Sequence, residues 1–343
     1  MSESQYTILQ GSRILVTGAN GFIGSHIVDH LLAFGYKVRG TVRQPKPWLN
    51  ELFDKKHGGG KFETVLLPNL NDAVDCDHMF DQVEGIIHVA TDVSMSPDAN
   101  KVITSSVQGT LAILEAAAKH PRIRRVVITS SQSAAYLPRA DHPGLVTEET
   151  WNDAAIEAAW DQNTPAATKP VFVYAASKTE AERSAFKWVE DHGRPFVLNS
   201  VLPCMTVGKI LAPEIKGSSQ ILIRKMLQGD DFPIKFLPPQ WIINVHDVAR
   251  LHIAALLSPA ITFDRIFAFA TPTTWSEVVH VLHKLCPENT LIPRDPLGDM
   301  SEKRDSVEVR PAKRAKEILG DFWGREEWVG LEESIKDGIA DLL

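Results

Sequence analysis

The stretch that decides the fold is Val16-Thr17-Gly18-Ala19-Asn20-Gly21-Phe22-Ile23-Gly24. An apolar run, Arg13-Ile14-Leu15-Val16, leads into it and suits a buried parallel strand. After it, Ile27, Val28, Leu31 and Leu32 recur at the spacing of a helix. The pattern therefore predicts a strand, a glycine turn and a helix, which is the setting of a dinucleotide-binding turn.

Each glycine of this turn has a separate physical task. Gly18 permits the tight turn, Gly21 lets the backbone approach a pyrophosphate, and Gly24 lets the helix pack closely on the strand. Free N–H groups at the helix start then face the phosphates. The residues expected to contact the cofactor here are Gly18, Asn20, Gly21, Phe22, Ile23 and Gly24.

The residues around the predicted second strand, 37–42, indicate which dinucleotide binds. An NAD-binding domain usually places an acid about 20 residues after the first glycine, where it holds the ribose hydroxyls. No acid occurs between His30 and Asn50, whereas Lys37, Arg39, Arg43 and Lys46 do occur there. Such cations can pair with the 2′-phosphate of NADP(H), so we predict NADPH; the alternative is that they are ordinary solvated charges.

Strands and helices alternate along the first two thirds of the chain. Apolar runs at 62–67, 85–90, 124–131 and 196–202 predict further strands, with long helices over 102–119 and from about Tyr174 to His192 between them. Alternation of this kind predicts an α/β Rossmann fold with a doubly wound parallel sheet. We expect an NADP-binding domain over 1–203, with a returning segment near 241–270, and a smaller, mainly substrate-binding domain over 204–343.

Composition narrows the possible partners. The 343 residues carry a net charge of −7, which disfavours a nucleic-acid binder. Three scattered cysteines, Cys76, Cys204 and Cys286, show neither metal-ligand spacing nor a disulfide framework, so no metal is expected. The first residues lack a signal-peptide pattern, and no apolar run is long enough to span a membrane. We expect a cytoplasmic protein without a membrane partner, as a monomer or a homodimer.

A second informative stretch is Tyr174-Ala175-Ala176-Ser177-Lys178. The i, i+4 spacing places the phenol and the ammonium one turn apart on a helix. A nearby ammonium favours the phenolate and so lowers the tyrosine pKa, which is useful for proton exchange. This pair follows Ser130-Ser131, the hydroxyls at the end of a predicted strand.

These motifs resemble the extended short-chain dehydrogenase/reductases over nearly the whole chain. The longer stretches Val16–Gly24, Tyr36–Arg43, Val173–Glu182 and Glu333–Asp337 look like the fungal NADPH-dependent aldehyde and methylglyoxal reductases, with the plant dihydroflavonol and cinnamoyl-CoA reductases as a neighbouring branch. The resemblance implies reduction of aldehydes or ketones to alcohols, with a small-molecule carbonyl compound as substrate.

The resemblance also implies roles for particular residues. Tyr174 would donate a proton to the carbonyl oxygen, Lys178 would lower the tyrosine pKa and hold the nicotinamide ribose, and Ser131 would hydrogen-bond the same oxygen. Ser133 is the alternative serine if the register differs by two. Further cofactor contacts are implied at Arg39, Arg43, Asn69, Leu70, Ala90, Thr91, Pro203 and Met205. Asn69 replaces the usual aspartate, and Ser106 replaces an asparagine that supports a proton relay in many members.

The substrate pocket is placed by its position relative to these motifs. Its expected residues are Val93, Gln132, Ser133, Phe172, Cys204 and Trp241, with Asp92 and Met205 nearby. A largely apolar set of this kind suits aryl or alkyl ketones and aldehydes, although ordinary packing is an equal alternative.

Two other functions fit the same fold. One is an NAD(P)-dependent epimerase or hydroxysteroid-type dehydrogenase, against which the missing acid counts. The other is a non-catalytic NADP(H)-sensing regulator, which would not need Tyr174, Lys178 and Ser131.

Overall fold

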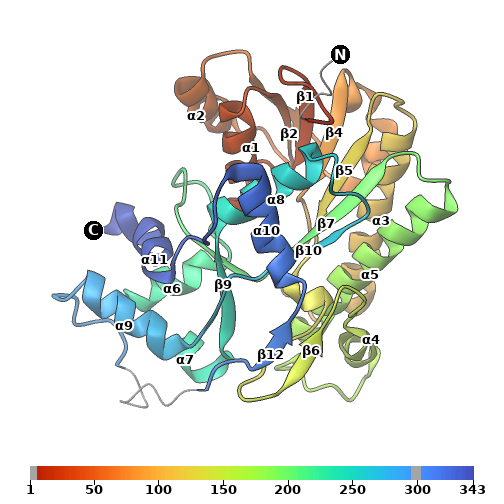
Figure 1. Cartoon of the computed structure of the whole chain (residues 1–343). Coiled ribbons are helices and arrows are strands. Elements are labelled where there is room, and N and C mark those ends of the chain that lie inside the picture. Colours follow the sequence, from red (N-terminus) through yellow and green to blue (C-terminus); the bar gives the residue numbers. More distant parts are fainter. Residues whose placement is uncertain (1–5, 295–302) are drawn as a thin grey trace.

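The computed structural model describes residues 6–294 and 303–343 (Figure 1). Residues 1–5, part of the segment that lacks a signal-peptide pattern, and residues 295–302, inside the region expected to bind substrate, lie outside the described residues. Within the described ranges, no helix combines the length and the apolar character that crossing a bilayer requires.

The central sheet of the described residues has seven parallel strands. In sheet order they are β10 (Arg265–Ala268), β7 (Val197–Pro203), β5 (Arg125–Thr129), β4 (Val83–His88), β1 (Arg13–Thr17), β2 (Lys37–Val42) and β3 (Phe62–Leu66). The order reverses between β1 and β4, and open parallel sheets bind ligands at such a switch point. The predicted doubly wound Rossmann sheet is confirmed.

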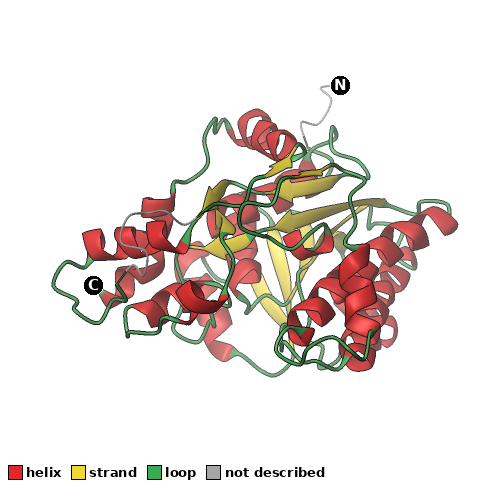
Figure 2. Ribbon diagram, turned by 90° about the horizontal axis from the view of Figure 1, so that it is seen from below, coloured by secondary structure: helices red, strands yellow, loops and turns green. Residues whose placement is uncertain are grey.

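Helices cover both faces of this sheet (Figures 1 and 2). This arrangement follows from strands such as β1, whose Ile14, Leu15 and Val16 are fully buried. One face carries α1 (Phe22–Ala33), α8 (Val245–Leu257) and α10 (Ala312–Trp323), with α2 (Pro47–His57) beside β3. The other face carries α3 (Ala99–Ala118), α5 (Lys169–Asp191), α4 (Asp153–Trp160) against α5, and the 3₁₀ turns η1 (Leu70–Asp75) and η2 (Asp77–Phe80).

Apart from α8, β10 and α10, most of the described residues beyond β7 build a smaller part with its own apolar cluster, which includes Trp275 and Ile335. Its small sheet contains β8 (Met205–Val207), β9 (Gln240–Asn244) and β11 (Thr271–Thr273). Its helices are α6 (Gln220–Met226), α7 (Phe232–Phe236), α9 (Trp275–Leu285) and α11 (Leu331–Ile339), with a final 3₁₀ turn η4 (Ala340–Leu342). A separate pair, β6 (Gly144–Val146) with β12 (Val307–Val309), joins the two halves of the chain.

Several boundaries differ from the expected ones. Helix α5 begins at Lys169 rather than near Tyr174, because Pro170 suits the first turn of a helix. Helix α3 begins at Ala99, where the Asp98 side chain accepts a hydrogen bond from the amide of Lys101. Tyr174 therefore lies inside α5, where helical turns on both sides hold its backbone.

Candidate active site

The glycine turn joins β1 to α1 at the carboxyl edge of the sheet. Gly18 has a φ of +67°, and its amide donates to Thr41 Oγ1 at 3.1 Å. A Cβ atom on Gly24 would lie 2.3 Å from the Gly18 carbonyl oxygen, so any other residue would displace the turn. Helix α1 starts after Gly21 without a side-chain cap, which leaves its first amides open to an anion.

The side chains beside these amides point into the protein. Phe22 packs with Ile215 and Val245, and Ile23 borders the same cluster. The first turn of α1 therefore offers mainly backbone to a ligand, with Asn20 half-buried next to it. A cradle of this kind fits the pyrophosphate of a dinucleotide.

Substitution of Gly24 tests this cradle. Gly24→Ala should raise the Kd for NADPH roughly 10-fold or more and lower the free energy of unfolding by about 1–3 kcal/mol, because the turn must move to make room. Fluorescence titration and urea unfolding measure the two effects. Gly59→Ala is the matched control, since a Cβ there meets nothing within 4 Å. Unchanged NADPH affinity in Gly24→Ala would contradict the assignment of the cradle.

Some of the cations predicted to bind a 2′-phosphate already have partners within the protein, and others do not. Arg39 lies in the middle of β2, and its Nε and Nη2 contact Glu63 at 2.8 and 2.7 Å. Its Nη1 donates to the carbonyl oxygens of residues 78, 79 and 81. The protein itself therefore occupies this guanidinium, and we leave Arg39 out of the phosphate site.

Arg43 directly follows β2 at the edge of the sheet that carries the glycine turn. Its side chain is exposed, and within the described residues it has no hydrogen bond or ion pair. Lys46 comes three residues later, half-buried at the start of α2. Arg43 is thus the predicted cation best able to meet a phosphate.

The three residues predicted to be catalytic meet where β5 ends. Ser131 lies two residues beyond the end of this strand, and its hydroxyl is close enough to the Tyr174 phenol of α5 to lower the pKa of that phenol. Ser131 Oγ also accepts a hydrogen bond from the Ser133 amide at 3.2 Å. Lys178, one turn after Tyr174, donates from Nζ to the Thr129 carbonyl oxygen at 3.0 Å. Ser131, rather than Ser133, is the serine that contacts the tyrosine.

Burial shifts the pKa values of Tyr174 and Lys178. It raises the pKa of Tyr174 above its ordinary value, and the hydrogen bond from Ser131 opposes this in part. The lowered tyrosine pKa expected from Lys178 is therefore not found, because desolvation of the phenolate dominates and the charge of Lys178 is not among the causes of the shift. Burial also lowers the pKa of Lys178 to about 8, while Glu182 raises it. Near neutral pH the site holds a phenol beside an ammonium group.

A small cavity of about 20 Å³ lies against Lys178, room for about one water molecule. It lies between α5 and the ends of β4 and β5, and Glu182, His88, Thr91, Thr110 and Ser130 contribute to its wall. Ser106, one turn before Thr110 on α3, is buried, and its hydroxyl has no partner within the described residues. The polar wall of the cavity would hold a water next to the ammonium group.

His88 ties the ends of β1 and β4 together. Its Nδ1 lies 2.8 Å from Thr17 Oγ1, and that oxygen accepts hydrogen bonds from the amides of Val89 and Ala90. Since Thr17 accepts two bonds, we assign its own proton to His88 Nδ1. Sequence analysis did not single out His88, although a histidine inside an otherwise apolar strand was a signal.

His252 has a similar task beneath β5. Its Nδ1 is 2.8 Å from the Val248 carbonyl oxygen, and its Nε2 is 2.8 Å from Thr129 Oγ1. The ring thus accepts a hydrogen bond from Thr129, the residue whose carbonyl oxygen holds Lys178. His252 lies on the face of the sheet opposite α5 and contacts the site through the Thr129 side chain.

Five largely buried histidines of the described residues have lowered pKa values, mainly because burial disfavours the imidazolium. Burial lowers the pKa to about 3 for His26 and His88 and to about 4 for His30 and His252, and it also lowers the pKa of His246. His30 and His246 are 2.9 Å apart, so each also disfavours charge on the other. All five are neutral at pH 7.

Acid should therefore destabilise the fold well before the carboxylates titrate. Each histidine binds a proton more readily in the unfolded chain than in the folded one. The contribution of these histidines to the free energy of unfolding is therefore fully present above about pH 6.5 and falls as the pH drops. The expected loss is about 1.4 kcal/mol per pH unit for each histidine, partly offset by the raised pKa values of Asp264 and Asp305. Urea unfolding at several pH values measures the slope. His78→Gln, at an exposed site, should leave it unchanged, and a flat profile from about pH 7 to about pH 5 would contradict the assignment.

The other residues expected to contact the cofactor lie at three places. Ala90 and Thr91 follow β4, and a Cβ on Gly18 would come within 3.1 Å of the Ala90 Cα, so this segment borders the glycine turn. Pro203 ends β7 and Met205 begins β8. Asn69 is the N-cap residue of η1. Leu70 packs against Gly109 of α3, where an added Cβ atom would lie 2.9 Å from the Leu70 Cβ. Much of the Leu70 side chain is thus already covered by protein.

The predicted substrate residues are not all equally placed for contact. Val93 is 57% exposed on the loop after β4, and the buried Gln132 has an Nε2 group without a partner within the described residues. Trp241 is half-buried against Phe269, with ring centroids 5.8 Å apart. Burial raises the pKa of the Cys204 thiol, so it is a packing residue and no nucleophile. Phe172 packs on a separate apolar cluster beside α3 and α4.

Sequence analysis missed Tyr136 and Asp305. The Tyr136 hydroxyl donates to Asp305 Oδ2 at 2.9 Å, and its ring stacks with Phe269 at 6.1 Å. The two residues are 169 positions apart, so no local spacing could pair them. Their bond fastens the segment after Ser131 to the strand pair β6–β12, next to Trp241 and Cys204.

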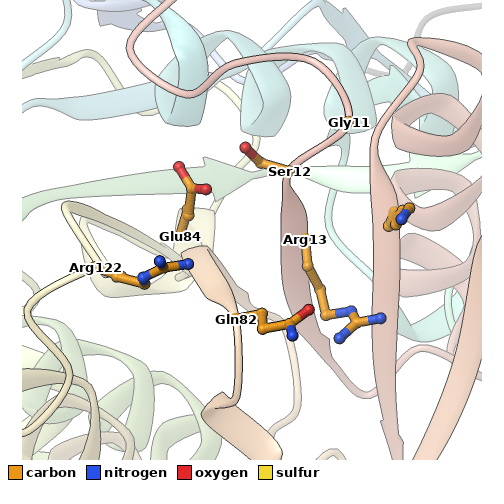
Figure 3. Close-up of a pocket in the computed structure, with 7 residues that line it drawn as sticks. Gly11, Ser12, Arg13, Gln82, Glu84 and Arg122 are labelled. Atoms are coloured by element: carbon orange, nitrogen blue, oxygen red, sulfur yellow. The ribbon is translucent and has the colours of Figure 1, made fainter.

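A separate polar depression lies at the opposite, amino edge of the sheet (Figure 3). Its volume is about 370 Å³, and its wall includes Arg13, Lys37, Glu84 and Arg122. Glu84 pairs with Arg124 and Arg13 with Glu63, so much of its charge is balanced. It lies away from the glycine turn and from Tyr174.

Comparison with known proteins agrees with this geometry. A family model described as the NAD dependent epimerase/dehydratase family matches residues 14–264, which include the glycine turn, Ser131, Tyr174 and Lys178. The chain belongs to this family. The resemblance to the extended short-chain dehydrogenase/reductases is thereby confirmed.

Several relatives that match this chain over nearly their whole length are named reductases. This chain is 43% identical to ketoreductase nvfG of Aspergillus novofumigatus over 99% of both chains. It is 36% identical to aldehyde reductase 2 of Sporidiobolus salmonicolor over 96% of both chains. The crystal structure of Gre2 from Candida albicans in complex with NADPH is similar with a TM-score of 0.81 and 27% identity, covering 96% of this chain and 99% of that one. These similarities support an oxidoreductase activity with a nicotinamide cofactor.

Proposed function

We propose that the protein reduces the carbonyl group of an aldehyde or ketone to an alcohol with NADPH, and that Tyr174 donates the proton. The observation that carries this proposal is the contact of Tyr174 with Ser131, one helical turn from the Lys178 ammonium. This arrangement lies across the switch point of the sheet from an uncapped glycine turn.

Tyr174 and Ser131 have different roles in this reduction. The bound nicotinamide supplies the hydride that reaches the carbonyl carbon. Tyr174 donates its phenolic proton to the carbonyl oxygen, and the raised pKa keeps this phenol protonated near neutral pH. The Ser131 hydroxyl stabilises negative charge as it develops on the same oxygen.

Lys178 stabilises the phenolate that remains on Tyr174 after proton transfer. The pKa of about 8 leaves its ammonium form predominant at neutral pH and depletes it in alkaline solution. A water in the adjacent cavity would return a proton from solvent along the hydroxyls of Thr91 and Thr110. We therefore expect reduction to slow above about pH 8.

The preference for NADPH is supported by the segment after β2. Arg43 is exposed and free to bind a phosphate, and no acid between His30 and Asn50 would repel it. One relative of known structure is described in complex with NADPH. We assign the cofactor to residues 1–203 with the returning segment 241–270, and the substrate mainly to 204–343.

The names of the relatives and the surrounding side chains support the substrate class. Relatives are described as a ketoreductase and an aldehyde reductase. Around Tyr174 we expect Val93, Trp241 and Tyr136 to supply apolar surface and Gln132 Nε2 to supply one unused donor. This combination suits a mainly apolar carbonyl compound with a further hydrogen-bond acceptor.

The test is turnover itself. The purified protein is incubated with aldehydes, aryl ketones, diketones or ketoesters, each with NADPH and with NADH, and the alcohol is identified by mass spectrometry. We expect alcohol formation with NADPH on several compounds. Tight NADPH binding without alcohol from any of them would favour the regulator, and equal use of NADH would overturn the assignment of Arg43.

A further inference from the structure

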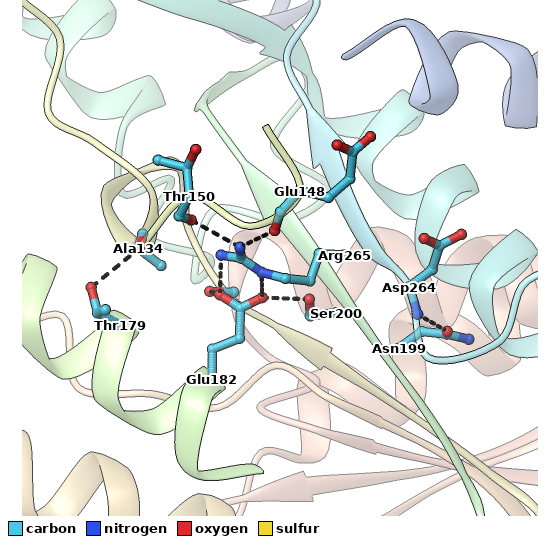
Figure 4. A network of polar contacts seen from close by, with 10 residues as sticks. Ala134, Glu148, Thr150, Thr179, Glu182, Asn199, Ser200, Asp264 and Arg265 are labelled. Atoms are coloured by element: carbon cyan, nitrogen blue, oxygen red, sulfur yellow. Dashed lines mark hydrogen bonds and ion pairs between the residues drawn. The ribbon is translucent and has the colours of Figure 1, made fainter. Parts of the chain in front are cut away.

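A buried carboxylate stands one helical turn beyond Lys178. Glu182 is only 1% exposed, yet its carboxylate has four polar contacts (Figure 4). It accepts hydrogen bonds from Ser130 Oγ at 2.7 Å and Ser200 Oγ at 2.5 Å, and from Arg265 Nε at 2.9 Å and Nη2 at 3.3 Å. A charge buried this deeply is costly unless it is paired, so the arrangement is closely specified.

Arg265 of β10 extends the network to the segment before α4. Its Nη1 donates to the carbonyl oxygens of Glu148 and Thr150 at 2.6 and 2.9 Å (Figure 4). Its guanidinium carbon lies 3.6 Å from the ring centroid of Trp151. One ion pair thus fixes a loop, a sheet-edge strand and helix α5 against one another.

The network reaches the reacting groups through Ser130. This residue stands between Thr129, whose carbonyl oxygen holds Lys178, and Ser131, which contacts Tyr174. Ser130 and Glu182 also line the cavity beside Lys178. The carboxylate is therefore linked to the site in two ways: by its hydrogen bond to Ser130 and by its negative charge near Lys178.

We propose that Glu182 is a positioning residue for the reduction, which fixes the Thr129–Ser131 segment through Ser130 and supplies the negative charge that favours the ammonium form of Lys178. This inference rests on the proposed function of Tyr174 and Lys178. Among the residues that the structure describes, no other acid lines the cavity: His88 from β4 faces the same space but is neutral, and Arg265 lies beyond Glu182.

The charge route predicts a shifted pH profile. Burial lowers the pKa of Lys178 and Glu182 raises it, so loss of the carboxylate should lower it further. In Glu182→Gln the alkaline limb of kcat/KM should move to lower pH by about one unit, so that the variant loses roughly 10-fold more activity than wild type at about pH 9. Glu182→Asp, which keeps the charge, should restore the wild-type limb. Glu180→Gln is the matched control on the partly exposed side of α5 and should leave the profile unchanged.

The hydrogen-bond route has its own variant, which keeps all charges. Ser130→Ala should lower kcat roughly 10-fold without moving the alkaline limb, because Ser131 and the Thr129 carbonyl lose their anchor. Wild-type kcat in Ser130→Ala, or an unmoved limb in a folded Glu182→Gln, would overturn the inference. If Glu182→Gln does not fold, Ser130→Ala decides alone. A wild-type protein that forms no alcohol would instead contradict the proposed function, so the two failures are distinguishable.

Discussion

Tyr174→Phe should lower kcat for carbonyl reduction by about 10²- to 10⁴-fold, the range typical of a lost general acid. The substitution removes only the phenolic oxygen, the atom that interacts with Ser131 and that we assign as proton donor. Binding of NADPH should survive, because the glycine turn and Arg43 are untouched. Stopped-flow absorbance of the reduced cofactor and fluorescence titration measure the two properties.

Tyr36→Phe is the matched control for this experiment. Its hydroxyl is also buried and donates to the Ile8 carbonyl oxygen at 2.7 Å, but it lies at the amino edge of the sheet. We expect it to lose about 1 kcal/mol of stability and to keep its kcat. Wild-type turnover in Tyr174→Phe would rule out the tyrosine as proton donor, whereas loss of NADPH binding in the same variant would show a structural role.

Arg43→Ala should raise the Kd for NADPH by about 10- to 100-fold and leave the Kd for NADH unchanged. The two cofactors differ only in the 2′-phosphate, and a hydrogen bond to a charged group contributes about 1.5–3 kcal/mol. Titration with both cofactors at constant ionic strength gives the two ratios.

Arg122→Ala provides the control for a general change in charge. Arg122 is exposed and lies at the amino edge of the sheet, in the depression of Figure 3. Neither Kd should change in this variant. Equal weakening of NADPH and NADH by Arg43→Ala would place the arginine elsewhere than at the 2′-phosphate.

The central sheet was predictable because its signals are local. The strand, turn and helix from Arg13 to Ala33 follow from consecutive residues, and α8 lies inside the predicted returning segment 241–270. Tyr174 and Lys178 were found for the same reason, since the i, i+4 spacing lies within one helix. Ser131 was assigned to the same site by the resemblance to the short-chain dehydrogenase/reductases.

Features that depend on distant pairing were not predictable. The pairing of β6 with β12 and the bond from Tyr136 to Asp305 join the middle of the chain to its end. Glu182 and Arg265 were not among the predicted functional residues, because periodicity shows a helix face but not the partner that covers it. Arg39 shows the converse: it was rightly seen as a cation near β2, but its partner Glu63 lies on the neighbouring strand.

Transfer of a labelled hydride tests the central claim most directly. The wild-type protein is incubated with a reducible ketone and NADPH that carries deuterium at the transferable position of the nicotinamide, and the product is examined by mass spectrometry. We predict an alcohol that is heavier by one deuterium on the former carbonyl carbon. An unlabelled alcohol, or no alcohol from any ketone or aldehyde despite tight NADPH binding, would contradict the account.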